Sequence, residues 1–78
     1  MPRFYFDYNL NGHIAVDNVG TVLPSLRAAK TEAAIAAAEW MKDHVTAQGT
    51  ELKLSVRDGQ TSPLFIVTAS VQLDPPVG

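Results

Sequence analysis

The sequence contains no cysteine, and this absence excludes two kinds of stabilised small protein. A chain without thiols forms no disulfide bond and offers no thiolate ligand to a zinc ion. Its two histidines make no metal-binding motif, so we expect neither a metal nor a cofactor. A domain of about 80 residues buries only about 60% of its unfolded surface, so its core is small. We therefore expect self-association, most simply as a homodimer, to add stability.

Strong net charge and long hydrophobic runs are also missing. The formal net charge is −2, which gives no general attraction to nucleic acids or anionic membranes. The alanine-rich stretch 33–41 is far shorter than the ~20 apolar residues of a membrane span. The N-terminal residues lack the apolar core of a signal peptide. These features predict a soluble, cytoplasmic protein that does not bind membranes.

Motifs for catalysis and phosphate binding are absent from the chain. No serine lies in a Gly-x-Ser-x-Gly sequence, and the single glycines in DNVG and RDGQ lack phosphate-loop spacing. Three acidic residues, Glu32, Glu39 and Asp43, share one side of the expected helix. Arg27 and Lys42 flank them, which is typical of a solvated helix surface. We expect no catalytic residue and no enzymatic activity.

Alternating side chains predict a β-hairpin at the start of the chain. Four apolar residues of segment 3–10 fall on one face of a strand, namely Phe4, Phe6, Tyr8 and Leu10. The dipeptide Asn11-Gly12 favours a tight turn. A returning strand is expected over residues 13–17, with Ile14 and Val16 facing the core. Turn-forming residues then break the strand within segment 17–20.

A single long helix is predicted over residues 26–47. Ser25 is a favourable N-cap, and Gly49 offers a C-terminal stop. A spacing of 100° per residue gathers an alanine-rich apolar stripe on one side. We expect Leu26 and Trp40 to be its large anchors. The full stripe comprises Leu26, Ala29, Ala33, Ala36, Ala37, Trp40, Met41 and His44.

Two further strands follow the helix. Residues 51–57 alternate cleanly and direct three apolar side chains inward, namely Leu52, Leu54 and Val56. A turn is expected over residues 58–63. Residues 64–73 form a long apolar strand whose inward side chains are Phe65, Val67, Ala69, Val71 and Leu73.

These elements predict an α+β fold with the order ββαββ. We expect a four-stranded, mainly antiparallel sheet with one long helix packed on one face. Strands 3–10 and 64–73 are the most apolar, so they are placed in the centre of the sheet. Residues 1–73 form one domain, and residues 74–78 form a flexible tail.

The face of the sheet opposite the helix suggests one function, as a nucleic-acid-binding or regulatory module. It would present Arg3, Tyr5, Lys53 and Arg57, and an aromatic ring beside basic residues is typical of some single-strand binders. Tyr5 is the only ring on that face, and Asp7 beside it repels phosphate. This function is kept as the alternative.

Apolar residues in places that should meet water favour a non-enzymatic interaction module that self-associates. Leu64 and Ile66 lie on the outer sheet face, and Ile35 lies on the polar face of the helix. A small sheet also has edges that accept an added strand. The candidate interaction surface comprises Arg3, Tyr5, Ile35, Lys53, Arg57, Leu64 and Ile66.

The order and spacing of these features resemble a family of short bacterial proteins. The shared pattern runs M-P-R-[FY]-[YF]-F, an N-G turn, D-x-x-G-x-x-L-P-S-L, A-A-x-x-E-A and a late VRDG. The family is frequent in rhizobia-like soil bacteria and is classed only as a domain of unknown function. The resemblance covers residues 2–73, with Asp7 where a histidine or similar polar residue is more usual. It implies a compact stand-alone unit and no assigned activity.

Overall fold

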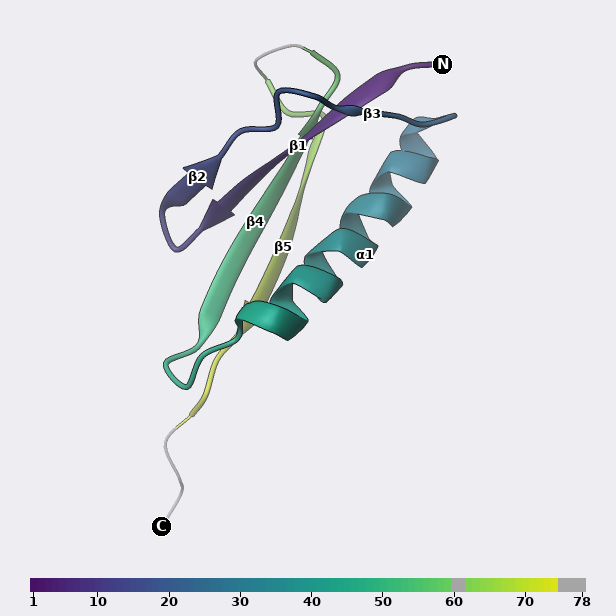
Figure 1. Ribbon diagram of the computed structural model, residues 1–78. Helices are drawn as coiled ribbons and strands as arrows, with labels where there is room; N and C mark the ends of the chain where they lie inside the picture. The colour runs from purple at the N-terminus through teal and green to yellow at the C-terminus, as the bar shows by residue number, and fades with distance from the viewer. Residues whose placement is uncertain (60–61, 75–78) are drawn as a thin grey trace.

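Five strands and one helix make up the computed structural model, which describes residues 1–59 and 62–74 (Figure 1). The elements in chain order are β1 (Arg3–Leu10), β2 (His13–Ala15), β3 (Thr21–Val22), α1 (Leu26–His44), β4 (Thr50–Arg57) and β5 (Phe65–Val71). The expected turn at 58–63 and tail at 74–78 lie partly outside the described residues.

The strands form an open antiparallel sheet in the order β2-β1-β4-β5, and β3 pairs with the beginning of β1. Helix α1 packs on one face of this sheet, over β4 and β5. Figure 1 shows that α1 runs alongside these strands and that β2 lies at the other side of the sheet. The predicted α+β class is therefore confirmed, with β3 as an added short strand.

The strand order corrects one expectation. The central strands are β1 and β4, and β5 lies at an edge, so the placement of residues 64–73 in the centre is wrong. Apolar residues on both faces of this segment suggested burial on both faces, yet Leu64 and Ile66 are 46% and 53% exposed. On the inner face, the expected residues of β5 pack against the core, whereas Leu73 lies beyond the strand and is 58% exposed.

The first hairpin has the expected Asn-Gly turn but not the expected second strand. Asn11 and Gly12 have φ values of 47° and 92°, as a two-residue turn requires. This turn pairs Tyr8 with Ala15, which places Ile14 opposite Asn9 on the outer face. The inward placement of Ile14 is therefore wrong, because turn geometry sets the register and one step reverses the faces.

The second strand is also shorter than expected, since β2 ends at Ala15 and not at residue 17. The side chain of Val16, expected to face the core, is 56% exposed. Helix α1 lies over β4 and β5 and therefore leaves this side of the sheet uncovered. Val16 lies two positions after Ile14, so the same register would direct it to the outer face, away from α1.

Helix α1 begins where the sequence predicts. The hydroxyl of Ser25 accepts a hydrogen bond from the Ala28 N–H at 3.1 Å, which caps the first turn. The helix ends at His44 because Val45 adopts an extended ψ of 135°, so the expected end at residue 47 is too late.

Small side chains dominate the contact between α1 and the sheet. The helix buries Ala29, Ala33, Ala37 and Met41 against β-strand residues Phe4, Phe6, Leu52, Leu54 and Val56. Leu26 is 43% exposed, and Trp40 is half-buried and stacks on His44 with ring centroids 3.7 Å apart. Met41 and the half-buried Trp40 are the large helix residues at the core, and the other large side chains come from the strands, where alanines let the helix backbone approach closely.

Candidate functional site

The edge of β1 is interrupted between β2 and β3, and Asp17 fills the gap. Residues 16–20 leave the sheet there, while β2 pairs with the end of β1 and β3 with its beginning. One carboxylate oxygen of Asp17 accepts from the Phe6 N–H at 3.1 Å. The other oxygen accepts from the N–H groups of Val19 and Gly20 at 2.9 and 3.0 Å. The carboxylate thus replaces a missing strand partner and closes the loop at the same time.

Arg57 joins β4 to this loop. Its Nε donates to Asp7 Oδ2 at 2.7 Å, and its Nη2 donates to the Asp17 carbonyl oxygen at 2.9 Å. Asp7 Oδ1 in turn accepts from the Asp17 N–H at 2.9 Å. The hydrogen bond to Asp7 raises the pKa of Arg57, so this side chain stays charged. A departure from the family pattern, Asp7, therefore has a definite structural partner.

Tyr5 and Arg3 pack against the same loop. The Arg57 guanidinium carbon lies 4.6 Å from the centre of the Tyr5 ring, and Arg3 Nη1 donates to the Val19 carbonyl oxygen at 2.9 Å. Gly20 has a φ of +78°, and a Cβ at this position would lie 2.9 Å from Tyr5 Cε1 and 2.8 Å from Arg3 Cγ. Glycine is required here for backbone conformation and for space.

The structure brings together only part of the candidate interaction surface. Arg3, Tyr5 and Arg57 form the cluster just described, and Lys53 lies farther along β4, opposite Asn9 and Thr68. Two other members, Leu64 and Ile66, lie beside or within the edge strand β5. Ile35, which is 48% exposed, lies on the side of α1 turned away from the buried alanines.

Sequence reasoning did not assign a role to Asp17 and Gly20 beyond forming a turn. The spacing D-x-x-G carried the available signal, because an aspartate side chain commonly accepts from backbone N–H groups two and three residues later. Its partner Phe6 follows from the pairing of β1 with β2 and β3, and its partner Arg57 follows from the pairing of β1 with β4.

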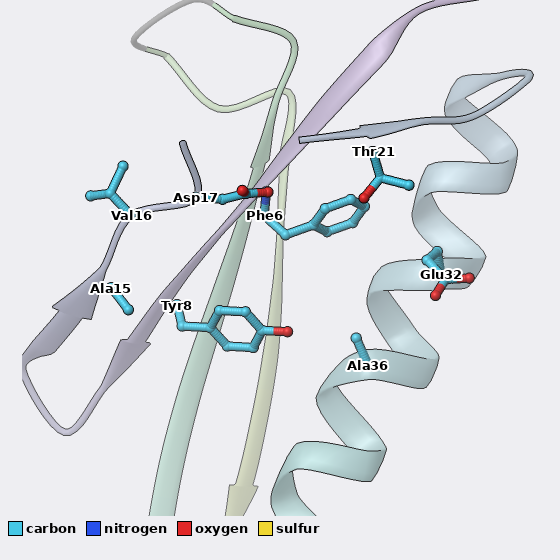
Figure 2. Close-up of a pocket in the computed structure, with 8 residues that line it drawn as sticks. All are labelled: Phe6, Tyr8, Ala15, Val16, Asp17, Thr21, Glu32 and Ala36. Atoms are coloured by element: carbon cyan, nitrogen blue, oxygen red, sulfur yellow. The ribbon is translucent and has the colours of Figure 1, made fainter. Parts of the chain in front are cut away.

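A groove of about 420 Å³ opens on the helix side of β1, where α1 does not cover the sheet (Figure 2). Figure 2 shows the Phe6 and Tyr8 rings extending from β1 toward α1. Burial raises the pKa of Tyr8, and the negative charge of Asp17 raises it further. The lining residues are Phe6, Tyr8, Ala15, Val16, Asp17, Thr21, Glu32 and Ala36.

The described residues form neither a metal-binding cluster nor a membrane-spanning helix. Within segments 1–59 and 62–74, no group of three or more histidine or acidic side chains could hold a metal ion. No helix in the same segments is long and apolar enough to cross a membrane.

The Asp17 carboxylate is expected to make stability depend on pH in the acidic range. Burial opposes its ionisation, but N–H donors of Gly20, Val19 and Phe6 and the charge of Arg57 outweigh burial and lower the pKa of Asp17. The unfolded chain therefore binds this proton more readily than the folded chain. The stabilisation is complete above the unfolded pKa, about 4, and is lost as the pH falls through the lower folded pKa.

Thermal unfolding of the natural chain and of Asp17→Asn, measured from about pH 6 down to about pH 2, checks this prediction. We expect the natural chain to be the more stable at the upper end and the difference to shrink on acidification. A difference that stays constant across the range would contradict the role of the ionised carboxylate.

Family comparison agrees with the extent of the fold. A family model described as "Domain of unknown function (DUF6894)" matches residues 3–70, from the first residue of β1 almost to the end of β5. The match includes the Asp17 loop and its partner Arg57. No curated protein and no solved structure matches the chain. The chain belongs to the family of domains of unknown function DUF6894.

Proposed function

We propose that the chain is a small, non-enzymatic interaction module of the cytoplasm that self-associates as a homodimer through the free edge of β5. The observation that supports this proposal is that the amino-acid composition of β5 does not match its position at the edge of the sheet. The β5 segment has the composition of a central strand, with apolar residues on both faces, yet it is an edge strand in the isolated chain. A second copy would supply the missing neighbour.

The β5 edge carries none of the features that protect exposed edges. Natural edge strands avoid pairing by short length, charged side chains, proline or a bulge. Segment 64–73 contains no charged residue and no proline. All seven residues of β5 pair with β4 in an unbroken register. The opposite edge strand, β2, has only three residues.

The helix presents a compatible surface on the same side. Lys30 Nζ lies 5.9 Å from the centre of the Phe65 ring of β5, whereas Glu32 and Ala36 line the groove on the β1 side. Ala34 and Ala38 follow Lys30 at intervals of four residues, so they share its side of the helix. Both alanines are exposed in the single chain. Their small size allows another helix to approach closely.

Simple geometry supports the formation of both contacts together. Helix α1 packs on β4 and β5 to the same extent, so its axis lies roughly above the space between them. Paired strands lie about 4.8 Å apart. Two copies joined through β5 would therefore place their helices about 10 Å apart, at the upper end of the usual distance between packed helices. The dimer would extend the sheet and turn the alanine sides of the two helices toward each other.

The outer sheet face supports the nucleic-acid alternative less well. The Tyr5 ring already packs against the Arg57 guanidinium, and that guanidinium is paired with Asp7. A nucleobase would have to displace Arg57 from the ring, and a phosphate would have to compete with a carboxylate. Both contacts instead hold the 16–20 loop in place.

The substitution Ile66→Lys tests self-association. Ile66 is 53% exposed on the outer face of β5, so lysine there is compatible with the folded monomer and protects the edge as it does in natural sheets. We expect the dimer dissociation constant to rise by about tenfold or more, which corresponds to at least ~1.4 kcal/mol. Sedimentation equilibrium over a range of protein concentrations measures it.

Ile14→Lys is the matched control, because Ile14 lies on the same sheet face but in the opposite edge strand and is 69% exposed. It should leave the dissociation constant unchanged. A natural chain that sediments as an 8.4 kDa monomer at all concentrations would refute the homodimer. Equal weakening by both substitutions would refute the assignment to β5.

A further inference from the structure

We propose that the groove between α1 and the inner face of β1 binds a basic side chain, arginine or lysine, carried by a partner protein. The site is separate from the proposed dimer edge, because the groove lies on the β1 side of the helix and β5 on the other. The inference therefore does not depend on self-association.

The shape of the groove suits one long side chain with its flanking residues. Its volume of about 420 Å³ falls within the usual range of ligand sites, about 300–1,000 Å³. The rings of Phe6 and Tyr8 form one wall, and Ala36 on α1 lies opposite Tyr8 (Figure 2). Because Ala36 is small, the space beside the Tyr8 ring stays open. An aliphatic stem could pack against these apolar surfaces.

The charge of the lining selects a cation. Two of the eight lining residues, Asp17 and Glu32, are acidic and none is basic. Within the described segments the ion pair found is Arg57 with Asp7, so Glu32 has no cationic partner there. Hydrogen bonds keep Asp17 ionised, as described above. An anionic ligand would be repelled mainly by Glu32, because Arg57 lies close to Asp17 and offsets part of its charge.

The helix extends this negative charge beyond the groove. Glu39 and Asp43 lie seven and eleven positions after Glu32, which places all three on the same side of α1. The sequence alone made this row look like an ordinary solvated helix surface. The tertiary structure places its first member at the rim of an apolar groove, where a partner would be partly shielded from water.

Arginine and lysine combine the two properties that the groove requires. Their aliphatic stems pack on apolar surface while the charged ends remain at the rim. A cation near the Tyr8 ring also gains a favourable interaction with the aromatic face. A neutral apolar side chain would fill the same space but would make no ion pair with Glu32, whose exposed carboxylate would keep water as its partner.

Nuclear magnetic resonance titration with two peptides tests the proposal. The probes are the heptapeptide Gly-Ser-Leu-Arg-Leu-Ser-Gly and the same peptide with the neutral isostere citrulline in place of arginine. We expect the arginine peptide to shift the amide signals of Tyr8, Ala15, Thr21 and Ala36. We also expect it to bind about two- to fivefold more tightly than the citrulline peptide, which is the effect of one partly exposed ion pair.

Two matched variants test whether the Glu32 carboxylate binds the arginine side chain of the peptide. Glu32→Gln should weaken binding of the arginine peptide about two- to fivefold and bring it close to the citrulline value. Glu51→Gln, an exposed residue of β4 outside the groove, should leave the affinity unchanged. Heteronuclear spectra of each variant check that the fold is retained.

Four outcomes would overturn the proposal. These are equal affinity of the two peptides, shifts that map outside the groove, no shift at millimolar peptide, and groove signals that move on dilution of the protein alone. The last result would mean that a second copy of this chain, and not a basic partner, occupies the groove.

Discussion

Leu54→Ala is expected to lower the free energy of unfolding by about 2–5 kcal/mol. Leu54 is completely buried in the central strand β4, between Tyr8 on β1 and Val67 on β5. Truncation removes apolar contacts and leaves a cavity that α1 and the neighbouring strands fill only in part. Because the whole domain is small, this loss is a large fraction of its stability.

Urea denaturation followed by circular dichroism measures the loss. Ile35→Ala is the control, because it shortens an aliphatic residue that is 48% exposed on the outer side of α1. That change should alter stability by no more than about 0.5 kcal/mol. Equal denaturation midpoints for the two variants would contradict the core assigned to β4.

Gly49→Ala is expected to cost about 2–3 kcal/mol. Gly49 connects the end of α1 to β4 with a φ of +89°, and a Cβ at this position would lie 2.7 Å from the Val71 carbonyl oxygen. The contacted atom belongs to the backbone of β5, so it cannot move aside as a flexible side chain could. The substitution therefore adds a steric conflict to the strain of a positive φ.

Gly12→Ala separates these two effects. Gly12 has a similar φ of +92°, but a Cβ there would meet no atom within 4 Å. We expect it to cost about 1 kcal/mol, from backbone strain alone. Thermal unfolding of both variants gives the comparison, and equal losses would show that the approach of Gly49 to Val71 is not tight.

Local features of the fold were predictable in detail. The Ser25 cap, the Asn11-Gly12 turn and the alternation of β1 and β4 depend on residues within a few positions of one another. A two-residue turn pairs residue 10 with residue 13, and this pairing alone places Ile14 on the outer face. Apolar character alone was the weaker guide at that position.

The candidate sites were only partly predictable. Arg3, Tyr5 and Arg57 were expected on one face, and they lie together there. Their engagement with the 16–20 loop depends on partners far apart in the chain. Asp17 binds the Phe6 N–H across 11 positions, and Arg57 reaches the Asp17 carbonyl oxygen across 40. The periodic patterns of the sequence do not predict such long-range contacts.

The sequence by itself determined the α+β class, the order of the helix and the longer strands and the absence of thiol chemistry, because these follow from composition, alternation and local capping. Only the tertiary structure decided that β5 lies at an edge and that α1 leaves one side of β1 open. Strand order depends on which strands pair, and apolar residues on both faces fit a central strand and an unprotected edge equally well. The two surfaces proposed for binding, the edge of β5 and the groove beside β1, exist because of this strand order and this position of α1.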